Sequence, residues 1–307
     1  MADKLKKSRE PKTVRGGGGG GGGLSKVPTE STSELSKNEV VLVNGELSPN
    51  KSYYIHAKWL KASFLKNAIE AVKNIIIQTN IDWIEEGISI QGMDASHVAL
   101  SNMFLSKNDC IFYHIKESIT TGIDMVILNR LLGTVDDEDS LEFFIKSDSD
   151  ATINVTLVSS DNKKRSHFQI PLLDIDTDSM NIPEMIYKGE IIQKSSDILC
   201  TVRDLSFFGD SVMFGIENNE FQIRVEGDYG KGERAWKDGI LQTTNNVSEI
   251  QQSYPIKYML MALKGTSVSP EVHIKMSHGS PIQISYSFGK SSKIVNYVAP
   301  KIEDMDE

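Results

Sequence analysis

The sequence predicts an α+β protein made of two similar halves, each built from short helices and mainly antiparallel strands. The first observation is a repeat about 130 residues apart: a short helix ending in glycine, a polar loop, a strand, a polar turn and another strand. The two copies span residues 128–158 and 260–288. A nearly constant spacing without identical residues indicates structurally equivalent halves. The second observation is length, because 307 residues with 39% hydrophobic side chains can fill two cores.

The chain begins with a segment that we expect to be a disordered, basic and glycine-rich leader, residues 1–51. Residues 1–15 hold six Lys or Arg against two acids, and eight glycines follow at 16–23. This composition cannot offset the entropy cost of ordering. The glycines are not a phosphate loop, because no Lys-Ser or Lys-Thr follows them. The leader could be a nuclear-import or DNA-touching arm, or a segment without a defined role.

An N-terminal domain is expected over residues 52–171, with order beginning near Tyr53. Apolar residues at helical spacing predict a helix over 62–78. Strands are predicted over 88–91 and 97–105, on either side of the sequence MDAS. The first copy of the repeat completes this half.

A connector is expected over residues 172–189. Its alternating acids, together with Asn181 and Pro183, disfavour a continuous helix or a central strand. Apolar residues among these polar ones indicate an exposed connector that binds a partner or, equally, a buried strut.

The C-terminal domain, residues 190–302, repeats the pattern of the first and ends in an acidic tail, 303–307. Its predicted elements are a helix over 197–208 and strands over 211–217 and 220–226. The Asn218-Asn219 pair suits a tight hairpin turn between those strands.

Charge and cysteine content restrict the function classes. The net charge of −9 argues against general adhesion to nucleic acid, so any such contact needs a locally positive surface. Cys110 and Cys200 fall one in each half without a CxxC pattern, which favours reduced thiols over a disulfide. No apolar run approaches the ~18 residues of a membrane-spanning helix, so no membrane partner is expected.

Basic residues recur on all of the predicted helices. Lys66 and Lys73 are seven residues apart, as are Lys257 and Lys264, and seven residues make about two helical turns. Arg130 and Arg203 occupy comparable positions on the other two helices. Cations on the side of each helix that faces away from the core predict a surface for a polyanion such as duplex DNA.

Acidic clusters and one histidine are the candidates for chemistry. The acids at 136–139 and at 174, 176 and 178 could hold a divalent ion, but they lack EF-hand spacing. His97 follows Ser96 directly, and neighbours on a strand point to opposite faces, which argues against proton sharing. We expect solvated acidic loops, no cofactor and no catalytic site.

Several apolar residues lie in segments expected to be turns. They are Met93 and His97 near MDAS, Met180, Asn181 and Ile182 in the connector, Pro281, and the ending YVAPKIED at 297–304. If the two halves pack side by side, these segments could line one groove.

Four segments together resemble the proliferating cell nuclear antigen family of DNA sliding clamps. They are GMDASHVAL at 92–100, RDLSFFGDSV at 203–212, the connector LLDIDTDSMNIPE and the ending APKIED at 299–304. The resemblance covers about 53–304 in the correct order. It implies two clamp domains per chain, with inner helices and outer sheets, and a pseudo-sixfold ring of three subunits around duplex DNA.

The resemblance also implies roles for individual residues. Positions matching those that face DNA in the family are Lys66, Lys73, Arg130, Lys164, Arg203, Lys257 and Lys264. Positions matching its groove for PCNA-interacting peptides are Met93, His97, Val98, Met180, Asn181, Ile182, Pro281, Tyr297, Ala299, Pro300 and Ile302.

The sequence departs from the family pattern in places. Asn67, Gly133 and Phe207 stand where cellular clamps tend to have Lys, Lys and His, and Asn218 stands where they have the lysine modified by ubiquitin. The segment 230–254, which matches the subunit-interface strand, has altered spacing, and its counterpart edge is 165–170. These differences indicate a divergent clamp and are compatible with a viral source.

The resulting expectation is a homotrimeric DNA sliding clamp without enzymatic activity. It would tether DNA polymerase and other proteins that carry PCNA-interacting peptides, require a clamp loader, and act in the nucleus or in a viral replication compartment. The alternatives are a subunit of a heterotrimeric checkpoint-type clamp, a monomeric processivity factor of the same fold and, from another class, a metal-dependent hydrolase.

Overall fold

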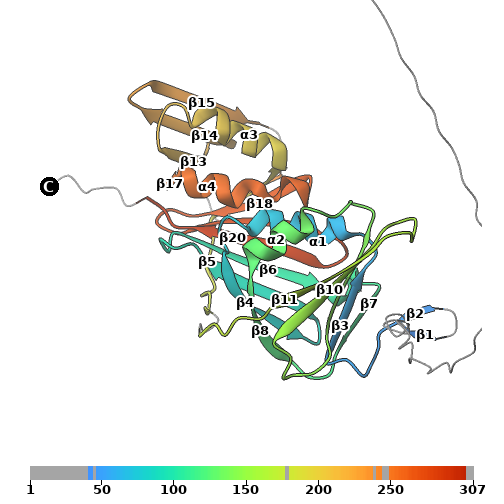
Figure 1. Ribbon diagram of the computed structural model, residues 1–307. Helices are drawn as coiled ribbons and strands as arrows, with labels where there is room; N and C mark the ends of the chain where they lie inside the picture. The colour runs from blue at the N-terminus through green and yellow to red at the C-terminus, as the bar shows by residue number, and fades with distance from the viewer. Residues whose placement is uncertain (1–40, 44–45, 177–179, 238–239, 244–248, 302–307) are drawn as a thin grey trace, which may run out of the picture. The chain divides into compact units, whose positions relative to one another are not determined.

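The computed structural model describes residues 41–43, 46–176, 180–237, 240–243 and 249–301 (Figure 1). They belong to one compact unit, Glu39–Glu307. Its first strands, β1 (Val41–Val43) and β2 (Glu46–Ser48), pair as a short hairpin inside the segment expected to be a disordered leader. Past this hairpin, the Asn50 backbone N–H donates to Nδ1 of the buried His56, at 2.8 Å.

The two halves contain the same elements in the same order, which confirms the repeat predicted from the sequence. The first half has β3 (Ile55–Trp59), α1 (Ala62–Val72), β4 (Gln78–Ile84), β5 (Gly87–Met93), β6 (Ala99–Ser106), β7 (Phe112–Ile115), β8 (Ile119–Asp124), α2 (Met125–Leu132), β9 (Ser140–Ile145), β10 (Thr152–Val158) and β11 (Arg165–Pro171). The second has β12 (Gly189–Lys194), α3 (Ser195–Leu205), β13 (Ser211–Glu217), β14 (Glu220–Gly227), β15 (Gly230–Trp236), β16 (Ile240–Thr243), β17 (Glu249–Pro255), α4 (Ile256–Ala262), β18 (Glu271–Met276), β19 (Ile282–Phe288) and β20 (Ser292–Val298). Short 3₁₀ helices follow β6 (η1, Lys107–Asp109) and α4 (η2, Leu263–Ser267).

Sheet topology shows how the halves join. The first half has the strand orders β11-β10-β9-β3-β7 and β6-β5-β4-β8, and the second has the equivalent orders β20-β19-β18-β12-β16 and β15-β14-β13-β17. Antiparallel pairing of β6 with β20 fuses one sheet of each half into a continuous nine-stranded sheet. The free edges left by this pairing are β11 and β15, among others.

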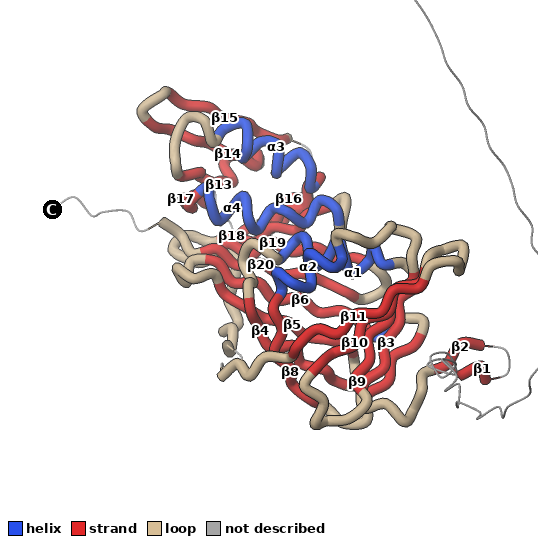
Figure 2. The backbone as a smooth tube through the Cα atoms, viewed as in Figure 1, coloured by secondary structure: helices blue, strands red, loops and turns tan. Residues whose placement is uncertain are grey.

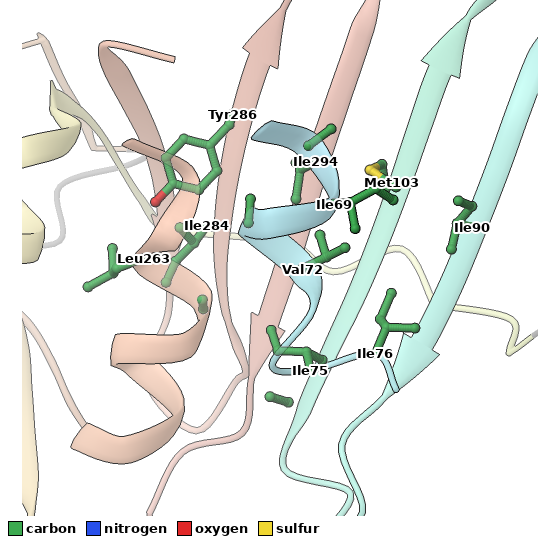
Figure 3. Packing of buried hydrophobic residues seen from close by; sticks show 14 of the residues in the cluster. Ile69, Val72, Ile75, Ile76, Ile90, Met103, Leu263, Ile284, Tyr286 and Ile294 are labelled. Carbon is green, nitrogen blue, oxygen red and sulfur yellow. The ribbon is translucent and has the colours of Figure 1, made fainter. Parts of the chain in front are cut away.

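The helices lie side by side on the sheets in the order α3, α4, α1, α2 (Figures 1 and 2). Their apolar faces form the core. On α1, Leu65, Ala68, Ile69 and Val72 are buried, at the i, i+3, i+4 spacing of one helix face. Figure 3 shows this face meeting β6 and β20 at the point where the halves join. Burial of these side chains supplies most of the helix's stability, because isolated helices of this length are marginal.

Two predicted boundaries were wrong. The helix predicted over 62–78 ends at Val72, and the buried Ile75 and Ile76 lie in a turn that leads into β4. Asn74 and the β-branched run after it disfavour helix, while their apolar spacing fits a helix by coincidence. The helix predicted over 197–208 spans Ser195–Leu205. The strand predicted over 211–217 is β13, and Asn218 and Asn219 have the positive φ values, 50° and 66°, of a tight hairpin turn.

Candidate functional site

A hollow of about 390 Å³ lies between the connector, the β5–β6 turn, the β18–β19 turn and the end of β20. Its lining is mostly apolar. Nine of the residues predicted for the groove line it: Met93, His97, Val98, Met180, Asn181, Ile182, Pro281, Tyr297 and Ala299. The structure thus brings together four segments that are far apart in the chain. We call this hollow the connector groove.

The Asp94 carboxylate holds the turn that carries two lining residues of the connector groove, His97 and Val98. Its oxygens accept backbone hydrogen bonds from Ser96 (2.7 Å), Val98 (2.8 Å) and Ala99 (2.6 Å). Burial opposes ionisation of this carboxyl, but the amides of Ala99, Ser96 and Val98 outweigh that effect and lower its pKa. His97 has φ 58° within the resulting turn.

This turn corrects the prediction of a strand over 97–105. The strand β6 begins at Ala99, because the side chain of Asp94 takes up the amides that would otherwise continue the ladder. His97 therefore lies on a loop, where it lines the connector groove. The argument that Ser96 and His97 point to opposite faces of a strand does not apply to this turn.

The connector is held over the sheet by side-chain amides. The Gln91 amide accepts from the Met180 backbone N–H (2.6 Å) and donates to the Met180 carbonyl (3.0 Å). Asn80 donates to the carbonyl of Ile175 at 3.1 Å. At the other end, the Ser277 hydroxyl accepts from the Lys188 backbone N–H at 2.8 Å. These contacts place one wall of the connector groove.

The opposite wall follows from the pairing of β6 with β20, which puts Tyr297 opposite Leu100. Beyond β20, the Ala299 backbone N–H donates to the Val98 carbonyl at 2.9 Å, so only its carbonyl remains to accept a ligand's hydrogen bond. Pro300 is half-buried but does not line the hollow, and Ile302 lies outside the described residues.

The sequence analysis missed three lining residues, Leu100, Pro183 and Met185. Leu100 and Pro183 lie inside the segments that carry the resemblance, so those segments contained the signal. Met185 had none beyond its position in the connector.

Lys66 and Lys73, both on α1, are already paired with acids. Lys66 Nζ lies 2.9 Å from a carboxylate oxygen of Asp137 and 3.2 Å from the Val135 carbonyl. Lys73, at the C-cap of α1, lies 2.6 Å from Glu70. The acidic loop at 136–139 therefore supplies a counter-ion to α1.

The other predicted cations lie on separate elements. Arg130, Arg203 and Lys257 are exposed on α2, α3 and α4, and Lys164 is exposed in the turn between β10 and β11. Lys264 lies on η2, because α4 ends at Ala262. The expectation of a single helix was therefore wrong here, because Lys257 and Lys264 lie on two successive helical segments, α4 and η2.

Comparisons with known proteins decide the family. The family model for the N-terminal domain of proliferating cell nuclear antigen matches residues 54–181, and the model for its C-terminal domain matches residues 181–301. The chain belongs to the proliferating cell nuclear antigen family. Its resemblance to these DNA sliding clamps, first seen in short sequence segments, is thereby confirmed.

Relatives match over almost their whole length. The chain is 30% identical over 257 residues to proliferating cell nuclear antigen of Chaetomium thermophilum, covering 81% of this chain and 99% of the relative. It is 29% identical over 255 residues to that of Dictyostelium discoideum, covering 80% and 99%. The crystal structure of the Entamoeba histolytica protein superimposes with a TM-score of 0.76 at 25% identity, covering 81% of this chain and all of that one.

The family assignment gives the chain the DNA-clamp fold and the function of a DNA sliding clamp in replication and repair. It lends no support to the metal-dependent hydrolase alternative. Among the described residues there is no group of three or more metal-ligating side chains. Asp137 and Glu138 pair instead with Lys66 and Lys61 (Glu138–Lys61, 2.8 Å), while Asp178 lies outside the described part of the chain. No described helix is long and apolar enough to cross a membrane.

Proposed function

We propose that three copies of this chain form a closed ring that encircles duplex DNA and tethers polymerase and other replication proteins to it, without chemistry of its own. The observation that carries the proposal is that the two free edge strands, β15 and β11, are equivalent to the two strands that pair within the chain, β6 and β20. Strand β15 occupies the place in its sheet that β6 occupies in the other half, and β11 occupies the place of β20. Because β6 and β20 pair within the chain, β15 and β11 are complementary edges for pairing between chains.

The internal pairing also gives a register for the contact between chains. On the core-facing side, Asn296 of β20 lies opposite Ser101 of β6. When the β10–β11 hairpin is superposed on the β19–β20 hairpin, Phe168 takes the place of Asn296. When the β14–β15 hairpin is superposed on the β5–β6 hairpin, Gly232 takes the place of Ser101. In this register Phe168 of one copy lies opposite Gly232 of the next, and on the outer face His167 lies opposite Glu233.

The side chains at these positions suit the pairing. Phe168 is a large apolar residue left 37% exposed on an edge strand. Gly232 offers no side chain, and the site of its missing Cβ is bordered by Leu205 and Phe208. The aromatic ring thus gains an apolar contact, and both edges satisfy backbone groups that would otherwise be an aggregation hazard.

The test is disulfide trapping combined with light scattering. In a background with Cys110 and Cys200 replaced by serine, we expect H167C/E233C to form covalently linked trimers, because directly opposed residues lie within disulfide reach. The matched control H167C/K231C is displaced by two residues on the same face and should not cross-link. A solution mass of 34.1 kDa at all concentrations would contradict the ring and favour a monomeric or heteromeric clamp.

The helices are proposed as the DNA-facing surface. The exposed cations Arg130, Arg203 and Lys257 lie on helices that run side by side, as do Lys66 and Lys73 of α1 (Figure 2). Lys264 and Lys164 extend the surface on η2 and on the β10–β11 turn. Affinity should be independent of sequence and strongly salt-dependent, because phosphate neutralisation releases counter-ions. On Lys66 and Lys73 a phosphate must displace an acidic side chain, which weakens their contribution.

The connector groove is proposed as the site for partner peptides with aliphatic and aromatic anchors. Its apolar lining and its carbonyl groups near Ala299 support burial of anchors beside a short run of peptide backbone. Replacement of Ile182 and Pro300 by Asp should abolish binding of such a peptide, measured by fluorescence anisotropy. Retained binding would contradict the site. A clamp loader to open the ring and a nuclear location complete the proposal.

A further inference from the structure

Three methionine side chains distinguish the lining of the connector groove. Met93 ends β5, and Met180 and Met185 lie in the connector. Met180 is 38% exposed, and the other two are half-buried. The Tyr187 hydroxyl lies 3.5 Å from Sδ of Met185, within hydrogen-bond reach of the sulfur. Methionines from β5 and from the connector therefore both line the groove.

Met93 and Met180 line a second hollow as well as the connector groove. This second hollow, of about 700 Å³, lies beneath the connector and is lined by the same two residues together with polar side chains such as Gln78, Asp82 and Thr120. Small polar solutes in this second hollow thus reach the residues Met93 and Met180 without any opening of the fold.

Other methionines provide a contrast. Met103, Met125, Met259 and Met276 are completely buried in the core. Met213 is half-buried and lines a separate hollow on the C-terminal domain, away from the connector. Met261 on α4 is half-buried as well. In the described part of the chain, thioethers therefore lie in the groove, in the core and at half-buried sites elsewhere.

We propose that Met93, Met180 and Met185 form a hydroperoxide-sensitive site, at which oxidation to sulfoxides weakens peptide binding in the connector groove. The inference rests on the proposed peptide-binding function of that groove. In the reaction a sulfur lone pair attacks one peroxide oxygen and the O–O bond breaks. Sulfur is oxidised by two electrons to the sulfoxide, and hydrogen peroxide is reduced to water, which keeps both protons.

The effect on binding follows from polarity. An apolar anchor that covers a thioether loses no hydrogen bond, whereas one that covers a sulfoxide removes a strong acceptor from water. We expect affinity to fall at least about tenfold after oxidation of the groove methionines. A bound peptide should in turn slow oxidation of these three residues, because it covers them.

The test uses the full-length protein treated with hydrogen peroxide at neutral pH. Mass mapping locates the added oxygen atoms, and fluorescence anisotropy measures binding of a labelled peptide with aliphatic and aromatic anchors. We expect sulfoxides in the groove and at Met213 but not at the core methionines, and recovery of affinity after treatment with methionine sulfoxide reductases.

Variants separate the groove from a general effect of oxidation. The comparison is the ratio of affinities before and after peroxide within each protein. In M93L/M180L/M185L the ratio should stay near one, whatever its starting affinity, because leucine matches the volume of methionine but has no thioether. M213L should lose affinity on oxidation as the parent does.

Two results would overturn the inference: unchanged affinity when all three groove methionines carry sulfoxide, or no oxidation there under conditions that oxidise Met213. Failure of the untreated protein to bind the peptide at all would instead overturn the proposed groove function, and the inference with it.

Discussion

The pairing of β6 with β20, which we call the seam, and the two free edges β11 and β15 are equivalent by topology but differ in chemistry. On the core-facing side of the seam, Met103 of β6 pairs with Ile294 of β20, both fully buried beneath α1 (Figure 3). At the corresponding place on β15 stands Arg234, which is exposed and donates to Thr201 of α3 at 2.8 Å. The seam is built like a domain core, whereas the edges are built like a surface.

This difference in side chains explains how the same strand pairing can be permanent within the chain and would be reversible between chains. Apolar residues at the seam make separation of the halves as costly as unfolding. Polar residues at the edges protect an isolated chain from aggregation and would leave only a few apolar contacts, such as Phe168, to stabilise the proposed assembly. The predictions below test this contrast, from the largest effect to the smallest.

The largest effect is expected at the seam. Replacement of the buried Ile294 by alanine should lower the free energy of unfolding by about 2–5 kcal/mol, through lost burial and a residual cavity. Chemical denaturation followed by circular dichroism measures it. Ser166, at the equivalent place on the free edge β11, is the control, and S166A should change stability by no more than about 0.5 kcal/mol. Equal losses in both variants would contradict the contrast.

A smaller and different effect is expected at the edge. Replacement of Phe168 by alanine should weaken assembly by roughly thirtyfold or more, as expected for a central aromatic anchor, while leaving the fold intact. Light scattering over a range of concentrations measures it, with the thermal transition as a check on folding. I186A removes an aliphatic side chain that is 89% exposed in the connector, and should assemble like the parent.

The cations proposed to face DNA provide a third test. Replacement of Lys66, Lys73, Lys257 and Lys264 by glutamate should impair loading and processive synthesis but not peptide binding. The single change K257E should reduce the salt dependence of DNA binding more than K66E, because Lys66 already pairs with Asp137. A salt titration measures this. In an F168A background the difference should shrink, since weaker assembly leaves fewer closed rings around DNA.

The smallest effect expected is the pH dependence that Asp94 gives to the turn beside the connector groove. The folded-state pKa of Asp94 is lowered from its ordinary 3.8, so its stabilisation is fully present above that value and is lost as pH falls through the lowered pKa. The contribution of Asp94 to peptide affinity should therefore be constant from pH 8 to about 5 and decline only in stronger acid. D94A should bind weakly at every pH. Since the turn adjoins the internal seam, F168A should keep the parent's profile.

Local patterns predicted much of this fold, and long-range contacts explain what they missed. The repeat, the strand β13 and the Asn218-Asn219 turn follow from spacing and turn chemistry over a few residues. The end of α1 was missed because Ile76 continues the helical period while it packs against Gly92 of β5. The pairing of β6 with β20 was also out of reach, because it joins segments almost two hundred residues apart.

The candidate site was predictable to a similar degree. Nine groove residues came from the family resemblance, and composition alone would not have joined the connector to the end of β20. The turn at Asp94 had a local signal, since Asp commonly accepts amides two to five residues ahead, but the apolar run after it favoured a longer strand. The ion pair of Lys66 with Asp137 needed the fold, because the partners are on different elements.

The fusion of two equivalent halves into one chain has a consequence for how the proposed ring would open. A ring of six separate one-domain subunits would have six equivalent interfaces, and it could open at any of them. In the proposed ring, every second interface lies within one chain, where Met103 and Ile294 pack in the core. Only the interfaces between chains, where β11 would pair with β15, could open without unfolding a subunit. A clamp loader would need to separate one interface between chains, and each subunit would then move as a rigid unit of two domains.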